Sequence, residues 1–271
     1  MDVSILQRQF AQIGARLKVL PENRRSRSIA PRGVVTVDIG QDRDGEFFSL
    51  TITPRADPEI AVVHQQRDIR HLLLMTRDSA QGDKHKFLCG HDERAWFVAA
   101  VPEVSGVASV KSAMEALKPG LVRGRQASLN VRPKERNRRR NAAFVRQGEW
   151  FFIPQPNLAV DRKLVLENEP LRRGGGKPHM VEFLYRTGGE TVYVTQKYPN
   201  GLTENQHQKL VSRNPDARHW QWAVLRRNPQ VYVRGKVRHA DHKTIDLSDW
   251  HQVLMNTETQ SAAMRHVAFI D

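Results

Sequence analysis

Short stretches in which apolar and polar residues alternate recur along this chain, with turn-forming residues between them. Residues 35–39 (VTVDI) and 48–52 (FSLTI) both alternate, and residues 42–45 (DRDG) lie between them. A period of two places the apolar side chains of a strand on one face, which a second layer can then cover. The pattern therefore predicts a β-hairpin, and with it an antiparallel sheet, in the first part of the chain.

The second half of the chain shows the same pattern. Residues 181–185 and 191–195 flank the sequence TGGE at 187–190. Adjacent glycines readily supply the positive φ angles of a tight turn, so we expect a second hairpin here. Shorter apolar runs predict further strands near residues 60–64, 71–76, 87–89, 96–101, 150–153, 164–166, 220–225, 231–237 and 244–247.

Helical spacing is confined to a few segments. Between residues 2 and 18, apolar side chains recur at steps of four, three and four from Leu6 to Leu17, which predicts a helix. Residues 107–117 repeat this spacing, and Thr203 begins a capping-box sequence, TENQ, that opens a short helix. The expected fold class is α+β, predominantly antiparallel β-sheet in two lobes with a few short helices.

The strongest change in composition falls between residues 121 and 147. From Arg123 to Arg146 this segment holds nine Arg or Lys residues and a single acid, Glu135. A run of like charge is typical of an interaction segment rather than of a core, so we interpret it as a boundary. The predicted domains are an N-terminal α+β lobe at 1–120, a basic linker or arm at 121–147 and a C-terminal β-rich lobe at 148–271.

The whole chain is also basic. It contains 43 Lys and Arg residues against 29 Asp and Glu residues, for a formal net charge of +14. Like charges repel one another in a compact state, so a polyanionic partner is a natural reason to keep such an excess. A solubility device or a general bias toward Arg would also account for it.

The basic segment predicts a site for phosphate groups. Guanidinium groups bind phosphate through two parallel hydrogen bonds and stay charged at any working pH. A second, smaller patch surrounds the three glycines at 174–176, and it lacks the lysine-serine or lysine-threonine ending of a nucleotide-binding P-loop. For both patches, a flexible solvated loop is the alternative. The predicted nucleic-acid-binding residues are Arg132, Lys134, Arg136, Arg138, Arg139, Arg140, Arg172, Arg173 and Lys177.

Aromatic residues crowd the second half of the chain, among them Tyr193, Trp220 and Trp222. Single-stranded nucleic acids are often bound by exposed rings beside a basic groove. We expect most of these rings to be buried, and one or two to be able to stack on bases. RNA is slightly preferred over DNA, because no predicted helix combines a basic reading face with a dimerisation pattern.

A cluster of histidines is the richest candidate for chemistry. His239, Asp241 and His242 lie close together, and His251 follows nine residues after His242. Imidazole and carboxylate groups suit zinc or a harder divalent ion, and histidine titrates near neutral pH. The first three residues are therefore candidate catalytic residues, and all four are candidate metal ligands. The alternative is a polar turn whose histidines contact phosphate or solvent.

One cysteine, Cys89, is present, so the chain can form neither an internal disulfide nor a cysteine-rich zinc site. His91 and Asp92 follow it, which would suit a nucleophile, but a small buried cysteine beside a tight turn is favoured. No apolar run approaches the roughly 18–20 residues of a membrane-spanning helix. A single thiol is typical of a reducing compartment, so we expect a cytoplasmic protein without a membrane partner.

These features favour a nucleic-acid-binding protein that acts through its basic segment, for example as a component of a ribonucleoprotein. The alternative is an enzyme, namely a nuclease or phosphoester hydrolase that uses His239, Asp241 and His242, with a divalent metal as cofactor. A third hypothesis is a structural protein whose basic face binds an acidic protein partner. The sequence leaves open whether the chain is an enzyme, and it does not define an oligomeric state.

Overall fold

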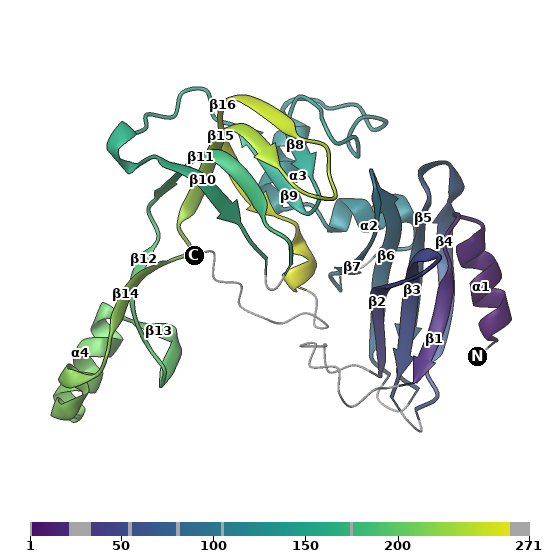
Figure 1. The fold of residues 1–271 in the computed structure, drawn as a ribbon, viewed down its shortest axis with the longest axis horizontal. Coiled ribbons are helices and arrows are strands. Elements are labelled where there is room, and N and C mark those ends of the chain that lie inside the picture. Colours follow the sequence, from purple (N-terminus) through teal and green to yellow (C-terminus); the bar gives the residue numbers. More distant parts are fainter. Residues whose placement is uncertain are drawn as a thin grey trace. The chain divides into compact units, whose positions relative to one another are not determined.

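Antiparallel strands predominate in the computed structural model and the helices are short, which confirms the expected α+β class (Figure 1). The described residues are 2–21, 34–53, 56–79, 82–103, 106–173 and 176–260. They divide into two compact units. Unit 1 comprises the described residues up to Ile153 with Asp241–Lys243 and 254–260, and unit 2 comprises Pro154–Ala240 and Thr244–Val253.

The first sheet of unit 1 has three strands in the order β1-β3-β2. They are β1 (Leu17–Pro21), β2 (Val35–Asp42) and β3 (Gly45–Ile52). The strands β2 and β3 form the antiparallel hairpin that the alternating pattern predicted, whereas β1 runs parallel to β3. The residues between β1 and the start of β2, at 22–33, lie outside the described residues.

Helix α1 (Val3–Ala11) covers the first part of the helix that the apolar spacing predicted. A carboxylate oxygen of Asp2 accepts hydrogen bonds from backbone N–H groups of the first turn and so caps the helix. The helix ends before Gly14, whose φ of 76° is incompatible with helical backbone. Leu17 therefore lies in β1, but it is buried in the same apolar cluster as α1, which explains why the spacing continued past the helix.

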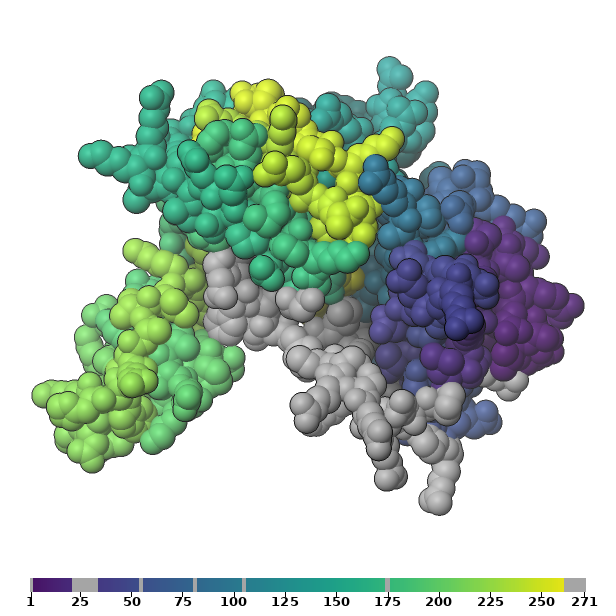
Figure 2. Space-filling model, viewed as in Figure 1, coloured from purple at the N-terminus to yellow at the C-terminus, as the bar shows by residue number. Residues whose placement is uncertain are grey.

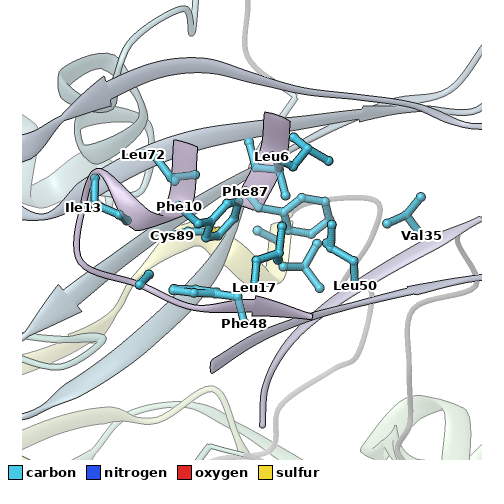
Figure 3. Packing of buried hydrophobic residues seen from close by; sticks show 14 residues of the cluster. Leu6, Phe10, Ile13, Leu17, Val35, Phe48, Leu50, Leu72, Phe87 and Cys89 are labelled. Atoms are coloured by element: carbon cyan, nitrogen blue, oxygen red, sulfur yellow. The ribbon is translucent and has the colours of Figure 1, made fainter. Parts of the chain in front are cut away.

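The second sheet of unit 1 is an antiparallel meander in the order β4-β5-β6-β7. Its elements are β4 (Glu59–Gln66), the 3-10 helix η1 (Arg67–Ile69), β5 (His71–Arg77), β6 (Lys84–Asp92) and β7 (Ala95–Val101). Side chains of this sheet, of the first sheet and of α1 form one apolar cluster, in which Figure 3 shows Phe10, Phe48 and Leu72. Burying each such side chain stabilises the fold by about 1.5–3 kcal/mol, so the cluster holds the two sheets together.

Helix α2 (Val110–Ala116) covers the opposite face of the second sheet. Successive strand residues point to opposite faces, so Leu73 and Leu88 face this helix while their neighbours face the other cluster. They are buried with Val110 of the helix. Ser109 caps α2 through a reciprocal capping box, which sets where the helix begins.

The basic segment at 121–147 lies in unit 1. It includes most of helix α3 (Gly120–Ser128) and ends in β8 (Val145–Gln147), which pairs with β9 (Trp150–Pro154). Val122, Ala143 and Phe144 of the segment are buried with Phe151 of β9. A small apolar cluster therefore lies beneath its charged surface. The 3-10 helix η4 (Thr257–Gln260) also belongs to this unit.

Unit 2 contains an antiparallel sheet in the order β10-β11-β15-β16. Its elements are the 3-10 helix η2 (Arg162–Leu164), β10 (Leu166–Leu171), β11 (His179–Thr187), β15 (Gln230–Arg238) and β16 (Ile245–Met255). The hairpin expected across residues 187–190 is absent, because β11 pairs with β10 and β15 and the following strand belongs to another sheet. Gly188 and Gly189, with φ angles of 69° and 79°, turn the chain from this sheet into the other sheet of unit 2.

Residues 190–227 form a smaller part of unit 2, which we call the arm. Its three-stranded sheet has the order β13-β12-β14. Its elements are β12 (Glu190–Thr195), β13 (Tyr198–Thr203), α4 (Glu204–Arg213), η3 (Pro215–His219) and β14 (Ala223–Arg227). Thr203 and Gln206 form the predicted capping box at the start of α4. Figure 1 shows α4 beside these strands, and in Figure 2 the arm is a distinct lobe of green atoms within unit 2.

Candidate functional site

The loop at 131–140, which carries most of the predicted phosphate-binding residues, is fixed by a buried lysine. Nζ of Lys118 donates to the carbonyl oxygen of Arg136 at 2.8 Å and to the carboxylate of Glu115 at 2.7 Å. Gln126 of α3 donates to the same carbonyl oxygen of Arg136 at 2.7 Å. Burial lowers the pKa of Lys118, and the contact with Glu115 opposes that shift. The loop is thus held in place by hydrogen bonds from the interior of unit 1.

Two acidic residues at the turn between β6 and β7 bind two of the basic side chains. Arg139 forms ion pairs with Asp92 and with Glu93, the latter at 2.8 Å. Arg146 lies 3.1 Å from Asp92. Burial by itself would raise the pKa of Asp92, but the two arginines outweigh it and the pKa is lowered. These ion pairs fasten the basic segment to the second sheet of unit 1.

The six basic residues predicted at 132–140 therefore divide into two groups. Arg139 is ion-paired, and Nε of Arg136 donates to the carbonyl oxygen of Val131 at 3.1 Å, so both of these arginines hold the segment in place. The other four side chains are exposed and form no ion pair with another described residue. These four are Arg132, Lys134, Arg138 and Arg140. Their charges face solvent from a loop whose backbone is anchored, which is the arrangement that a polyanion can bind.

The second predicted patch lies in unit 2, between β10 and β11. Arg172 and Lys177 are exposed and Arg173 is half-buried, whereas residues 174 and 175 lie outside the described residues. The carbonyl oxygen of Lys177 lies 3.2 Å from Nε2 of His239. A histidine and several cationic side chains therefore lie at the same end of the strands of the unit 2 sheet.

His239 has a partner that the sequence did not reveal. The register between β11 and β15 places Met180 opposite Arg238, so His179 lies opposite His239 one step further along. The two rings stack with centroids 4.1 Å apart and planes 20° from parallel. Ring nitrogens of the two residues lie within 4.8 Å of each other. Zinc–nitrogen bonds are about 2.0–2.1 Å long and lie in the imidazole plane, so both rings would have to leave the stacked arrangement to bind one ion.

Asp241 and His242 follow in the turn between β15 and β16, and this part of the turn belongs to unit 1. Nδ1 of His242 lies 3.6 Å from a carboxylate oxygen of Glu93, and the backbone N–H of Lys243 donates to the same oxygen. Glu93 itself has a φ of 58°, which is unusual for a residue with a side chain. Glu93 thus binds both the basic segment, through Arg139, and the turn that carries the predicted histidine.

His251 does not join the other predicted metal ligands. It lies in β16 opposite Val233, which precedes His239 by six residues. A strand rises by about 3.3 Å per residue, so His251 and His239 are roughly 20 Å apart along the sheet. His251 is buried, and its Nδ1 lies 2.7 Å from the carbonyl oxygen of Asp249. The prediction that His251 shares a metal site with His239 is therefore wrong.

The cysteine is part of the core. Cys89 is fully buried in β6, and burial raises the pKa of its thiol. A protonated thiol without access to solvent is a poor nucleophile, so the favoured prediction of a buried structural cysteine is confirmed. The neighbouring His91 packs its ring edge-on against Trp96, with centroids 4.9 Å apart.

Comparisons with family models, with curated proteins and with solved structures found no match to this chain. Within the described part of the chain, no helix has both the length and the apolar character needed to cross a membrane.

Proposed function

We propose that this protein binds nucleic acid through the exposed cations of the loop at 131–140. The observation that carries the proposal is the division of the basic residues into an anchoring group and a solvent-facing group. Arg132, Lys134, Arg138 and Arg140 form no ion pair with another described residue, and Lys118 holds the loop from beneath. Cationic side chains on an anchored loop bind phosphates without first breaking internal ion pairs, which favours affinity.

RNA is the polymer that we propose first. Readers of duplex DNA usually insert a helix into the major groove and dimerise to span two half-sites. The helix that adjoins the basic loop is α3, which packs Val122 and Gln126 into unit 1, and the proposed phosphate-binding residues follow it in the loop rather than lying on it. Loops with cationic side chains suit flexible or single-stranded RNA, and a ribonucleoprotein is a fitting context for such a protein.

A matched pair of variants tests this proposal. In the first, Arg132, Lys134, Arg138 and Arg140 are all changed to Ala; in the second, four exposed cations elsewhere in unit 1 are changed to Ala. The control residues are Arg8, Arg43, Lys84 and Lys111. Both variants lose the same charge, so a general electrostatic effect would be equal. Each phosphate contact with a single strand contributes about 0.7 to the slope of log K against log salt concentration.

The expected result is a salt slope that falls by about three in the loop variant and changes little in the control. Labelled single-stranded RNA, single-stranded DNA and duplex DNA are compared in the same salt series. Equal effects of the two variants would show diffuse binding and contradict a site on this loop. Absence of binding to all three polymers at near-physiological salt would reject the proposal, and an acidic protein would then be the partner to seek.

The stacked histidines favour a second candidate function, namely metal-dependent cleavage of phosphoesters. The contact between Nε2 of His239 and the carbonyl oxygen of Lys177 selects the tautomer whose lone pair is on Nδ1. His179 lies beside it, and His242 follows His239 by three residues in the chain. Histidine nitrogens suit zinc and related transition metals, which activate water for hydrolysis.

Metal analysis of the purified chain and a cleavage assay test this second function. One equivalent of bound metal that is lost in His179→Asn, together with cleavage of RNA that stops in the same variant, would support it. Metal-free protein that leaves the strand intact in the presence of added zinc, manganese or magnesium would contradict it.

A further inference from the structure

The aromatic residues of the second half fall into two groups in unit 2. Tyr185 lies in β11 and Trp250 in β16, and their ring centroids are 6.3 Å apart. The other group lies in the arm and consists of four aromatic residues and one histidine. They are Tyr193, Tyr198, His207, Trp220 and Trp222. The arm has 38 residues, so these five rings are concentrated in a short part of the chain, and none of them belongs to β10, β11, β15 or β16.

Three of these rings have nearly the same orientation. The planes of Tyr198, Trp220 and Trp222 lie within 26° of one another, and their centroids are 5.9–6.3 Å apart. Face-to-face stacking in a single column would place the outer two rings much further apart than this. The rings are therefore offset and present their faces over an area wider than a single ring.

The rings are held from the side that faces α4. His207 of this helix stacks on Tyr193 with centroids 4.2 Å apart, and the same imidazole meets Trp222 edge-on at 4.7 Å. The indole N–H of Trp222 donates to the carbonyl oxygen of Ala217 at 2.8 Å. Trp222 is thereby fixed in orientation by the helix and by η3, which gives the neighbouring rings a rigid support.

The arm does not bury its rings. Of residues 190–227, all of which are described, Val192 and Ala217 are buried, whereas Tyr198, Trp220 and Trp222 are half-buried. A ring that served only to fill an apolar core would have less of its surface exposed to solvent. These rings therefore combine a packed side with accessible surface, as side chains that receive a flat ligand do.

The charge around the rings selects the kind of ligand. Nζ of Lys197 lies 4.1 Å from the centroid of Trp220, at the turn between β12 and β13. The arm contains six Lys or Arg residues and three Asp or Glu residues. A cation already covers part of the aromatic surface, so a methylated ammonium group would be repelled. A ligand with a flat ring and a negative charge next to it satisfies both the rings and the lysine.

We propose that the arm is a base-stacking platform for single-stranded nucleic acid, in which a base displaces the ammonium group of Lys197 from the face of Trp220 and Lys197 then contacts a neighbouring phosphate. This inference rests on the proposed function and adds to it a second contact, the class of strand and the residues that select it. Stacking on aromatic side chains tolerates any base, so the platform would bind single strands with little sequence preference. Duplexes keep their bases stacked on each other and would not use it.

The test compares Trp220→Leu with Trp220→Phe in the full chain, using a labelled single-stranded RNA, the same sequence as DNA, and the duplex. Loss of a stacked ring is expected to weaken single-strand binding by roughly 5- to 150-fold, and Phe should restore most of it. The salt slope should stay unchanged in both variants, because no charge is removed. Affinity for duplex should also stay unchanged.

Lys197→Ala provides a second variant, at an exposed position of the turn between β12 and β13. It should lower the salt slope for single strands by about 0.7. Circular dichroism and the thermal midpoint of each variant show whether the arm is still folded.

The outcomes separate this inference from the proposed function. Wild-type binding that depends on the loop at 131–140 but is equal in Trp220→Leu and in Lys197→Ala would overturn the platform and leave the proposed function standing. Absence of nucleic-acid binding by the wild type would overturn both. Binding of a trimethyllysine peptide in place of any oligonucleotide would show that the rings receive a cation, and would also overturn the platform.

Discussion

Neighbouring arginines in the basic loop have opposite roles because of residues that are distant in the sequence. Arg139 is paired with Glu93, which lies 46 residues earlier, whereas Arg138 and Arg140 have no ion pair with a described residue. The chain turns and bends through this loop, so one side chain can face the fold while its neighbours face solvent.

Replacing Lys118 tests whether the buried lysine holds the loop. Lys118→Met keeps the apolar stem but removes the donor to Glu115 and to the carbonyl oxygen of Arg136. We expect the free energy of unfolding to fall by about 2 kcal/mol, because polar groups near the interior lose a hydrogen-bond partner. Urea unfolding measures the change, and Lys111→Met, at an exposed position of α2, is the matched control.

The same variant links the fold to the proposed function. A loop that is no longer held should bind RNA more weakly although Arg132, Lys134, Arg138 and Arg140 are all still present. Equal urea midpoints for Lys118→Met and Lys111→Met would show that the buried amine does not hold the loop.

The sequence could identify the basic loop but could not rank its residues. Composition shows where charge is concentrated, and that prediction led to the four exposed cations. Whether a given arginine faces solvent depends on where Asp92 and Glu93 lie in the folded chain. An ion pair across so many residues leaves no local pattern, so Arg136 and Arg139 looked equivalent to their neighbours.

At the scale of elements, local turn chemistry was easier to predict than strand pairing. The two glycines at 188 and 189 were recognised as a turn, but the turn joins strands of different sheets. Alternation shows that a segment is a strand without showing its partner. The same limit hid His179, because its position opposite His239 follows from the register of β11 and β15 and from nothing in the nearby sequence.

The bulge in β15 allows a sharper test of the unit 2 sheet. Two residues of β15, Gly235 and Lys236, face the single residue Glu182 of β11, and Gly235 has a φ of 81°. A Cβ atom at this position would lie 2.6 Å from a carboxylate oxygen of Glu182, and this oxygen accepts a hydrogen bond from the backbone N–H of Lys236. Glycine is therefore required both by backbone conformation and by the approach of Glu182.

Gly235→Ala is expected to lower the free energy of unfolding by about 2 kcal/mol, from the left-handed backbone and from the displaced carboxylate together. Adding Glu182→Ala should relieve the steric part, so the loss from Gly235→Ala measured in that background should shrink to about 1 kcal/mol. Urea unfolding of the wild type, both single variants and the double variant gives the comparison. A Gly235→Ala variant as stable as the wild type would show that the strand can adopt another register at no cost.

At the scale of the whole molecule, cations are distributed over separate parts of one chain. The loop at 131–140 belongs to unit 1, whereas the patch around Arg172 and the arm belong to unit 2. Contacts that are linked by the same chain raise each other's effective concentration, so several weak phosphate contacts can add up to firm binding of a flexible strand. A long, flexible polyanion can use such separate sites without any fixed geometry between them.

This distribution of charge also predicts how stability depends on salt. A net charge of +14 makes the folded chain repel itself, and salt screens this repulsion. The ion pairs that salt would weaken include the pair of Arg139 with Glu93, which is partly buried and therefore less sensitive to screening. The thermal midpoint should thus rise between about 10 mM and about 200 mM sodium chloride, where the Debye length falls from about 30 Å to less than 10 Å. Changing Arg132, Lys134, Arg138 and Arg140 to Ala should reduce that rise, because a group of neighbouring like charges is removed.

A single-stranded oligonucleotide at low salt should raise the midpoint of the wild type more than that of the variant, since a ligand stabilises the state that binds it. A midpoint that falls with salt in the wild type would mean that favourable ion pairs outweigh the net repulsion, and the reason to expect a polyanionic partner would be lost.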